Sequence, residues 1–332
     1  MTLHLFNPEN DLALALGCRH YTPPPHAAQL HRAGALMPLL WAEPGDAVLA
    51  PGESEFDSAE VDRCAPWGWS LDARRQFLNA GVSEAVLPSA EAIERMRMLS
   101  HRRSSVELLR LIGMEELAAR EMTDPDEVVE AERQTPGLWL KSPWSCSGRG
   151  VFCASSLSPE ALRSRAAGII HRQGSVMAER GLKGKRLDFA ALYTVAEGGA
   201  VGFEGWSVFR AEERGVYTGN LVAPQDRLLQ TILDAGVDPR PLIGPLAEAL
   251  ATLIGNDYTG PLGIDMMAHE EGLHPCIELN LRRTMGHVAL AVAGRTTRPS
   301  LLGWQLNSSV SRENCLISHP NGFSLTLTET NL

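Results

Sequence analysis

The segment that most limits how this chain can fold is 262–280, where two apolar runs are separated by a Glu-Gly step. This pattern is typical of an antiparallel β-hairpin. A turn centred on Glu271-Gly272 places Asp265 opposite Glu278, and Asn280 then lies on the same face because side chains alternate along a strand. Two opposed carboxylates between apolar neighbours repel each other unless a cation lies beside them. Since these ligands are all oxygens, we predict a magnesium site at Asp265, Glu278 and Asn280; the alternative is an edge hairpin with solvated carboxylates.

A lysine and a glycine-containing loop form a second motif. Residues 138–141 read as a strand that ends at Lys141, residues 145–150 are Ser-Cys-Ser-Gly-Arg-Gly, and a second strand begins at Val151. Glycines allow the backbone N–H groups of such a loop to approach a polyphosphate closely, and Lys141 adds positive charge. All three lysines of the chain lie within residues 141–185, which favours a phosphate contact for at least one of them. The alternative is an ordinary hairpin turn.

Two arginines follow the acidic hairpin. Arg282 continues the alternation of Glu278 and Asn280, so we expect it to point toward the same site. A guanidinium beside metal and phosphates would stabilise the charge that develops in phosphoryl transfer. For Arg283 an interdomain salt bridge is the preferred interpretation, and a substrate contact is the alternative.

Periodicity elsewhere predicts α/β and α+β lobes. Strands and helices alternate in residues 1–97, which indicates a small parallel, Rossmann-like lobe. Residues 98–182 have the mixed order of a small α+β lobe, and residues 183–332 contain several β runs and two helices. Each lobe could bury enough apolar surface to fold unaided. Residues beyond about 300 give only weak signals.

Composition limits the class of protein. The chain is 44% hydrophobic and 21% charged, and no apolar run approaches the ~20 residues that span a bilayer. The N-terminus lacks the basic region of a signal peptide, and the six cysteines are scattered without a CxxC spacing. A net charge of −10 without a long Lys/Arg cluster argues against a nucleic-acid partner. We therefore expect a cytoplasmic protein without membrane or nucleic-acid partners, and a homodimer is compatible with the sequence.

The motifs, in this order and spacing, resemble those of the ATP-grasp superfamily. A glycine loop after a lysine-bearing strand is followed by an acidic hinge at 176–182 and then by Asp…Glu-x-Asn-x-Arg. The spacing from Asp265 to Asn280 is similar to that of D-alanine–D-alanine ligases, and residues 278–282 resemble the biotin carboxylase version. The likeness covers roughly residues 95–295, and the lobe before it would suit the N-terminal pre-ATP-grasp domain.

The resemblance implies an activity and its cofactors. ATP and Mg²⁺ would activate a small-molecule carboxylate as an acyl phosphate, which an amine or similar nucleophile then attacks. Catalysis would come from positioning and charge neutralisation rather than from a protein nucleophile. A phosphotransferase on the same fold and a catalytically silent nucleotide-binding protein are the alternatives, and the sequence names neither the acid nor the nucleophile.

The resemblance also implies roles for matching positions. Lys141 would contact the α-phosphate and the adenine edge and, with Arg282 on the acyl phosphate, would serve catalysis. Closure over the β- and γ-phosphates would come from Ser147, Gly148, Arg149, Gly150 and Val151. Residues 145–150 contain two glycines and two serines without a large apolar anchor, so we expect them to form a mobile lid over the γ-phosphate. The adenine hinge would consist of Glu179, Arg180, Gly181 and Leu182, and Asp188 would take the ribose hydroxyls. Many members have an Asp-Lys pair where this chain has His101-Arg102, so Arg102 would replace that lysine as a phosphate contact.

Polar and aromatic segments of the N-terminal lobe are candidate substrate contacts. Irregular backbone at the C-terminal end of a parallel strand is where α/β folds bind ligands. The candidates are Asn7, Glu9, Asn10, Asp11, Trp67 and Trp69. In the alternative, residues 7–11 cap a helix that follows at Leu12, and the tryptophans belong to the core.

Overall fold

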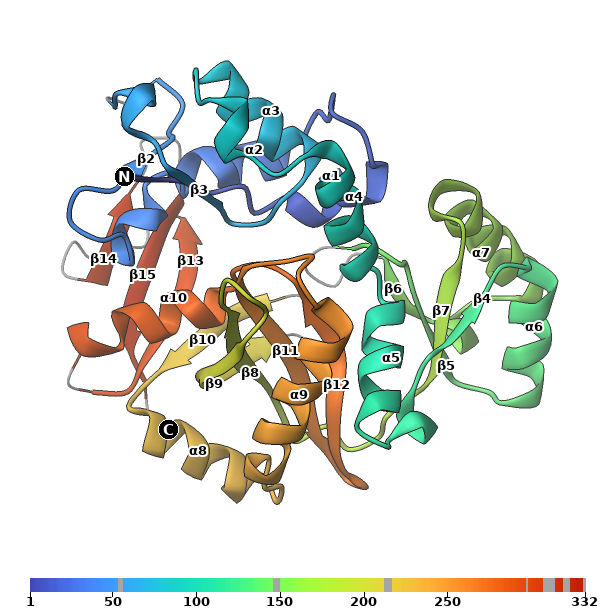
Figure 1. The fold of residues 1–332 in the computed structure, drawn as a ribbon. Coiled ribbons are helices and arrows are strands. Elements are labelled where there is room, and N and C mark those ends of the chain that lie inside the picture. Colours follow the sequence, from blue (N-terminus) through green and yellow to red (C-terminus); the bar gives the residue numbers. More distant parts are fainter. Residues whose placement is uncertain are drawn as a thin grey trace.

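The computed structural model of the protein describes residues 1–52, 56–145, 150–211, 217–296, 298–306, 314–318 and 323–330. Three sheets organise this part of the chain, with three, four and eight strands. One sheet falls within each of the segments 1–97, 98–182 and 183–332. In Figure 1 they form an upper lobe, a lobe at the right and a larger lobe below.

The N-terminal lobe is parallel, as predicted. Its central strand β1 (Thr2–Leu5) pairs in parallel with β2 (Ala47–Val48) and β3 (Arg63–Pro66). Its helices are α1 (Asn10–Leu16), α2 (Pro25–Ala33), α3 (Leu71–Asn79) and α4 (Ala90–Leu99), with 3-10 turns at Met37–Leu40, Ser58–Glu60 and Glu84–Val86. Ser70 and Ser89 cap α3 and α4, because each hydroxyl accepts a hydrogen bond from the backbone N–H three residues later.

The four-stranded sheet is antiparallel, in the order β4-β7-β5-β6. Its strands are β4 (Arg120–Met122), β5 (Leu138–Lys141), β6 (Val151–Cys153) and β7 (Val176–Arg180). Its helices are α6 (Pro125–Gln134) and α7 (Pro159–Gln173), with 3-10 turns at Glu115–Leu117 and Ala154–Ser156. Both helices lie on its outer side in Figure 1. By contrast α5 (Arg103–Leu111) packs against the large lobe, because Leu108 and Leu109 belong to that lobe's core.

The largest sheet is antiparallel, in the order β12-β11-β8-β9-β10-β13-β15-β14. Its strands are β8 (Leu187–Val195), β9 (Val201–Ala211), β10 (Tyr217–Val222), β11 (Gly260–His269), β12 (Gly272–Asn280), β13 (Ser300–Leu306), β14 (Cys315–Ser318) and β15 (Phe323–Glu329). Its helices are α8 (Gln225–Asp234), α9 (Ile243–Ile254) and α10 (Met285–Val292), with 3-10 turns at Arg240–Leu242 and Ala293–Arg295. The main core lies between the sheet and α8 and α9.

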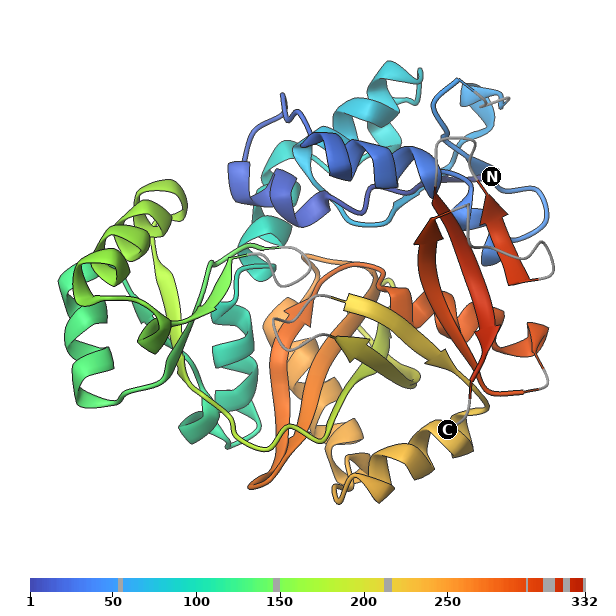
Figure 2. The same ribbon diagram turned by 180° about the vertical axis from the view of Figure 1, so that it is seen from behind.

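The N-terminal lobe and the C-terminal strands share a core. Phe6 and Trp67 pack in one cluster with Val288 of α10, Leu302 of β13 and Leu325 of β15. Figures 1 and 2 both show β13 and β15 beside this lobe. The weak signals after residue 300 therefore conceal three strands that complete the large sheet.

The hairpin of β11 and β12 pairs Asp265 with Glu278 as predicted, but by a different route. The turn is Glu270-Glu271, one residue earlier than expected, because His269 pairs with Gly272. A register shift between Asp265 and Met267 places three residues of β12, 275–277, opposite one residue of β11. Pro275, which cannot donate to the ladder, lies in this bulge. Beyond the bulge the strands return to the predicted register, so Asp265 pairs with Glu278.

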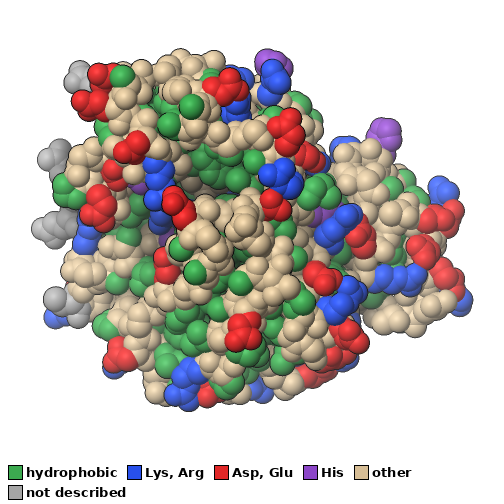
Figure 3. All heavy atoms as spheres, in the orientation of Figure 1, with side chains coloured by type: hydrophobic (Ala, Val, Ile, Leu, Met, Phe, Trp, Pro, Cys, Tyr) green, Lys and Arg blue, Asp and Glu red, His purple; other side chains and the backbone are tan. Residues whose placement is uncertain are grey.

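The charge pattern on one face and the lengths of the described helices bear on possible partners. On the face in Figure 3, Lys and Arg side chains are interspersed with Asp and Glu, and neither sign gathers into a broad patch. Among the helices that the structure describes, none is long and apolar enough to cross a membrane.

Candidate active site

A cleft of about 590 Å³ lies where the three lobes meet. Its floor is one face of the large sheet. Asp265 pairs with Ala190 of β8, which in turn pairs with Ser207 of β9, so these side chains form a row across the sheet. Glu278 and Asn280 continue this face on β12. The small lobe contributes Lys141, Glu179 and Val151 to the walls, and the N-terminal lobe contributes Phe6, Pro8, Leu30 and Trp67.

The acidic cluster has the electrostatics of a cation site. Burial and the neighbouring Glu278 carboxylate raise the pKa of Asp265 to about 7, although Asn280 donates a hydrogen bond to it. Across the described ranges no group of three His, Cys, Asp or Glu side chains is placed to hold a metal. The site instead offers two carboxylates and one amide. This donor set suits Mg²⁺, which takes its remaining ligands from water and phosphate oxygens, and a divalent cation would offset the repulsion that raises the pKa of Asp265.

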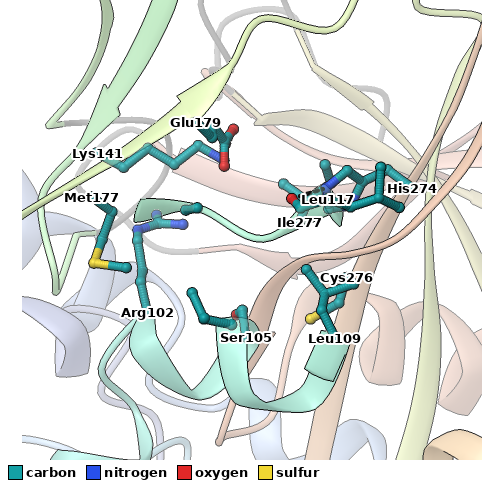
Figure 4. Close-up of a pocket in the computed structure, with 12 residues that line it drawn as sticks. Arg102, Ser105, Leu109, Leu117, Lys141, Met177, Glu179, His274, Cys276 and Ile277 are labelled. Atoms are coloured by element: carbon teal, nitrogen blue, oxygen red, sulfur yellow. Dashed lines mark hydrogen bonds and ion pairs between the residues drawn. The ribbon is translucent and has the colours of Figure 1, made fainter. Parts of the chain in front are cut away.

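Two buried cations face the cleft from the small-lobe side. Lys141 Nζ lies 2.5 Å from Glu179 Oε1, across β5 and β7. Arg102, just before α5, lies 2.9 Å from Glu278 Oε1 through Nη2 and also donates to Ser145 Oγ at 3.0 Å. Figure 4 shows Lys141 reaching Glu179 above Arg102, beside a small pocket of about 10 Å³. Each cation thus has a carboxylate partner here, and both line the cleft.

Arg282 connects the large lobe to the N-terminal lobe. Its Nε and Nη2 donate to Asp11 Oδ2 at 3.0 and 2.7 Å, and Nε is 3.1 Å from Oδ1. Arg282 lines the cleft next to Asn280, as the alternation along β12 predicts. The structure therefore brings the predicted catalytic arginine and one predicted substrate residue, Asp11, into direct contact.

The predicted hinge divides between the cleft and the exterior. Glu179 and Leu182 line the cleft, whereas Arg180 pairs with Glu271 at 2.7 Å. A Cβ at Gly181 would lie 2.7 Å from the carbonyl oxygen of Gly137, so glycine is needed there. Asp188 lines the cleft and binds Lys185 at 2.8 Å.

The predicted phosphate loop is only partly described. Ser147, Gly148 and Arg149, and with them most of the predicted lid at residues 145–150, lie outside the described residues. Gly150 has φ of +83°, and a Cβ there would lie 2.7 Å from Ser142 Oγ, so the loop ends at a position that requires glycine. Val151 lines the cleft.

Most of the N-terminal candidates serve the lobe itself. Asn7 is buried and donates to the carbonyl of Gly68, and Asn10 is buried beside the same glycine. Glu9 Oε1 lies 2.8 Å from His31 Nδ1. Because these side chains have partners inside the lobe, Asn7, Glu9 and Asn10 do not line the cleft, contrary to expectation.

The aromatic and arginine candidates also separate. Trp67 lines the cleft, but Trp69 packs against Phe77 with ring centroids 5.8 Å apart. Arg283 is stacked on Trp41, with its guanidinium 4.6 Å from the ring centroid, and does not line the cleft. Residues 7–11 do lead into α1, with Glu9 at the N-cap position and Asp11 in the first turn, but Glu9 makes no side-chain capping bond.

Comparison with known proteins bears on the fold. No protein-family model matches the sequence, and a search of curated proteins gave no match. Among solved structures, N5-carboxyaminoimidazole synthetase from Staphylococcus aureus in complex with ADP has a TM-score of 0.55 at 12% identity, over 99% of this chain and 93% of that one. A putative ATP-grasp superfamily protein from Archaeoglobus fulgidus has a TM-score of 0.54 at 13% identity over 100% of both chains. This chain has the ATP-grasp fold.

A third structure agrees with this assignment. Biotin carboxylase from Campylobacter jejuni, as a β,γ-ATP complex, has a TM-score of 0.54 at 12% identity, over 99% of this chain and 88% of that one. The ATP-grasp resemblance of the sequence motifs is thereby confirmed for the fold. The matches extend over almost the whole chain, including the N-terminal lobe.

Part of the cleft in this ATP-grasp fold escaped the sequence analysis. The missed residues lie on β9, β10 and β13: Ser207, Phe209, Tyr217, Asn220 and Trp304. The signal was a polar residue within an otherwise apolar run, as at Ser207 between Trp206 and Val208. It could be recognised only with the knowledge that this face of β9 is the floor of the cleft.

Proposed function

We propose that this chain is an ATP- and Mg²⁺-dependent ligase that activates a carboxylate for attack by an amine or a similar nucleophile. The observation that carries the proposal is that one cleft holds Asp265, Glu278 and Asn280 on its floor and Lys141, Arg102 and Arg282 on its walls. Glu179, Asp188 and Lys185 also line the cleft, so its described lining has four carboxylates and four cations. Such a mixed set suits a metal-bound polyphosphate and an acidic substrate together.

The nucleotide would occupy the part of the cleft between the two antiparallel sheets. Lys141 and Arg102 would face phosphate oxygens, and Glu179 and Leu182 would lie beside the base. Asp265, Glu278 and Asn280 would hold Mg²⁺, which supplies neutralisation of the phosphate charge when bound. The similar structures in complex with ADP and with β,γ-ATP support a nucleotide in this fold.

The carboxylate would react beside Arg282. A carboxylate oxygen attacks the γ-phosphorus and ADP leaves; the nucleophile then attacks the acyl carbon and phosphate leaves. The guanidinium of Arg282, held in place by Asp11, would stabilise the negative charge at this point. Cys276 is unsuited to act as a nucleophile, because burial raises the pKa of its thiol to about 12.

The test is to measure ADP and phosphate release with pools of carboxylic acids and amines. Free phosphate that appears only when an acid and a nucleophile are both present supports the ligase. A phosphorylated final product would make the chain a phosphotransferase. Nucleotide binding without turnover in any pool would make it a binding protein.

A further inference from the structure

Part of the cleft has apolar, mostly aromatic walls. Six side chains define this aromatic chamber: Phe6, Leu30, Trp67, Phe209, Tyr217 and Trp304. They come from the N-terminal lobe, from β9 and β10 and from β13. Phe6 and Trp67 are fixed against each other edge to face, with centroids 5.1 Å apart, while Leu30, Phe209, Tyr217 and Trp304 are half-buried. Phe6 and Trp67 are only 1% and 5% exposed, so the apolar surface open to the cleft comes mainly from the other four side chains.

The described lining of the aromatic chamber is uncharged. Of the cleft-lining residues that the structure describes, none from the N-terminal lobe, β9, β10, α10 or β13 is charged. The charged lining residues all lie on the nucleotide side or at Arg282. A ligand group with a charge of its own would lose its hydration in this chamber without gaining a partner.

The polar groups of the chamber floor form a neutral chain of hydrogen bonds. Tyr217 Oη donates to Asn220 Oδ1 at 2.6 Å, and Asn220 Nδ2 donates to Ser207 Oγ at 2.7 Å. Ser207 and Asn220 are each only 2% exposed. These two hydrogen bonds give the buried side chains of Asn220 and Ser207 polar partners without an ion.

The sheet sets the distance between Asp265 and the floor of the aromatic chamber. Ser207 is two strands away from Asp265 along the paired row, and on the next strand Asn220 pairs with Phe209, two residues further along β9. With strands about 4.8 Å apart, Ser207 lies about 10 Å from Asp265. A molecule with its carboxylate at Arg282 would extend its body over this floor.

We propose that the aromatic chamber binds the body of the acid substrate, and that this body is bulky, apolar and uncharged, with an aromatic ring as the best fit. The inference rests on the proposed ligase function, because it assigns the acid to this end of the cleft. It names a substrate class: monocarboxylic acids with an aromatic or large aliphatic group, and not dicarboxylic or amino acids.

The first test measures binding by calorimetry, with Mg²⁺ and a non-hydrolysable ATP analogue present. The probes are 3-phenylpropanoate, hexanoate, glutarate and 4-aminobutanoate. We expect 3-phenylpropanoate to bind at least about tenfold more tightly than glutarate or 4-aminobutanoate, because only its body avoids the desolvation cost of a second charge. Equal or tighter binding of the charged acids would overturn the proposal.

A substitution in the chamber tests the location. Leu30→Arg places a cation in the wall, and it should reduce the preference for 3-phenylpropanoate over glutarate by about tenfold or more. His26→Arg adds the same side chain at an exposed position of the same helix and should keep the wild-type preference. An unchanged preference in folded Leu30→Arg would show that the acid binds elsewhere, and the wild-type panel decides the substrate class if this variant does not fold.

The same acids, with ATP, Mg²⁺ and hydroxylamine, separate the inference from the ligase proposal. A ligase converts acid, ATP and hydroxylamine into hydroxamate, ADP and phosphate. Hydroxamate formed mainly from glutarate or 4-aminobutanoate would overturn the chamber's role while supporting the ligase. The expected binding preference without any hydroxamate would support the chamber and contradict the ligase.

Discussion

At the scale of single residues, Lys141 has the environment of a ligand-binding cation. It is only 7% exposed, and its ammonium contacts Glu179 at the mouth of the cleft. Lys141→Ala should weaken binding of a Mg²⁺–ATP analogue by about 1.5–3 kcal/mol, the scale of a hydrogen bond to a charged group. Calorimetry checks this, with Lys183→Ala, an exposed lysine, as the control. Unchanged affinity in Lys141→Ala would remove it from the nucleotide site.

A substitution of Glu278 distinguishes a metal site from a simple ion pair. It faces Asp265 and contacts Arg102, so a structural role alone would predict a stability defect in Glu278→Gln. A metal ligand predicts instead that thermal stability is nearly retained while Mg²⁺-dependent ATP turnover is lost. Glu270→Gln, in the exposed turn of the same hairpin, is the matched control. Turnover near the wild-type rate in Glu278→Gln would refute the metal assignment.

The predictable part of the candidate site is the part set by local alternation. Arg282 was expected beside Glu278 and Asn280 because side chains on a strand alternate, and the cleft includes all three. Its ion pair with Asp11 joins residues far apart in the sequence, and no periodicity encodes such a contact. Likewise Trp67 and Trp69 look equivalent in the sequence, but only the packing of the lobe places one in the cleft and the other on Phe77.

At the scale of elements, the pairing of Asp265 with Glu278 was predicted correctly, but the turn and the bulge that produce it were not. The expected turn lies one residue late, and the bulge at 275–277 compensates for that shift at Asp265 and Glu278. Pro275 within a predicted strand was the available signal, since proline in a strand marks an edge or a bulge. Pairing that depends on a bulge cannot be derived from alternation alone.

The elements that sequence periodicity missed are those whose partners are distant. α10 is apolar on nearly all sides, with Gly286, Val288, Ala289 and Val292 buried, so it lacks the amphipathic period of a surface helix. It lies between the large sheet and the N-terminal lobe. β13 and β15 complete the same core, and their weak patterns become interpretable only with that lobe in place.

The close contact of α10 with the sheet gives a prediction for Gly286. A Cβ there would lie 2.7 Å from Ser207 Oγ and 2.9 Å from Ser207 Cβ, so Gly286→Ala must push the helix away from β9. We expect a loss of about 1–3 kcal/mol in the free energy of unfolding, the usual cost of overpacking. Gly244→Ala in α9 is the control: no atom lies within 4 Å of its added Cβ, and it should be neutral or stabilising. Equal stability of the two variants in urea would contradict the packing of α10.

At the scale of the whole molecule, the three lobes contribute unequal parts of one cleft. The small lobe provides two cations and the Glu179 carboxylate, the large lobe provides three carboxylates together with Lys185 and Arg282, and the N-terminal lobe provides apolar walls. The shared core of Phe6, Trp67, Leu302 and Leu325 ties the N-terminal lobe to the large sheet. The aromatic chamber is therefore built on the same packing that stabilises the contact between these two lobes, and substitutions in its buried walls will affect folding as well as binding.

Buried histidines couple the stability of the whole fold to pH. Burial, reinforced by Arg103, lowers the pKa of His101 to about 4, and burial, reinforced by Arg283, lowers that of His287 to about 3. The unfolded chain, with histidine pKa values near 6.5, therefore binds more protons than the folded chain between these limits. The contribution of each histidine to the free energy of unfolding therefore falls as the pH drops through 6.5, by about 2 kcal/mol between pH 8 and pH 5.

Single substitutions isolate this effect from opposing groups. Asp265, with its pKa raised to about 7, gains stability over the same range as the pH falls, so the total slope of the wild type is not diagnostic. The informative quantity is the change in unfolding free energy between pH 8 and pH 5, measured in urea for the wild type and for His101→Asn. The substitution should make this change less destabilising by about 2 kcal/mol, because asparagine cannot take up the proton. His20→Asn, at an exposed position, should leave the wild-type difference unchanged. If His101→Asn keeps the wild-type difference, then His101 is not held neutral in the folded protein.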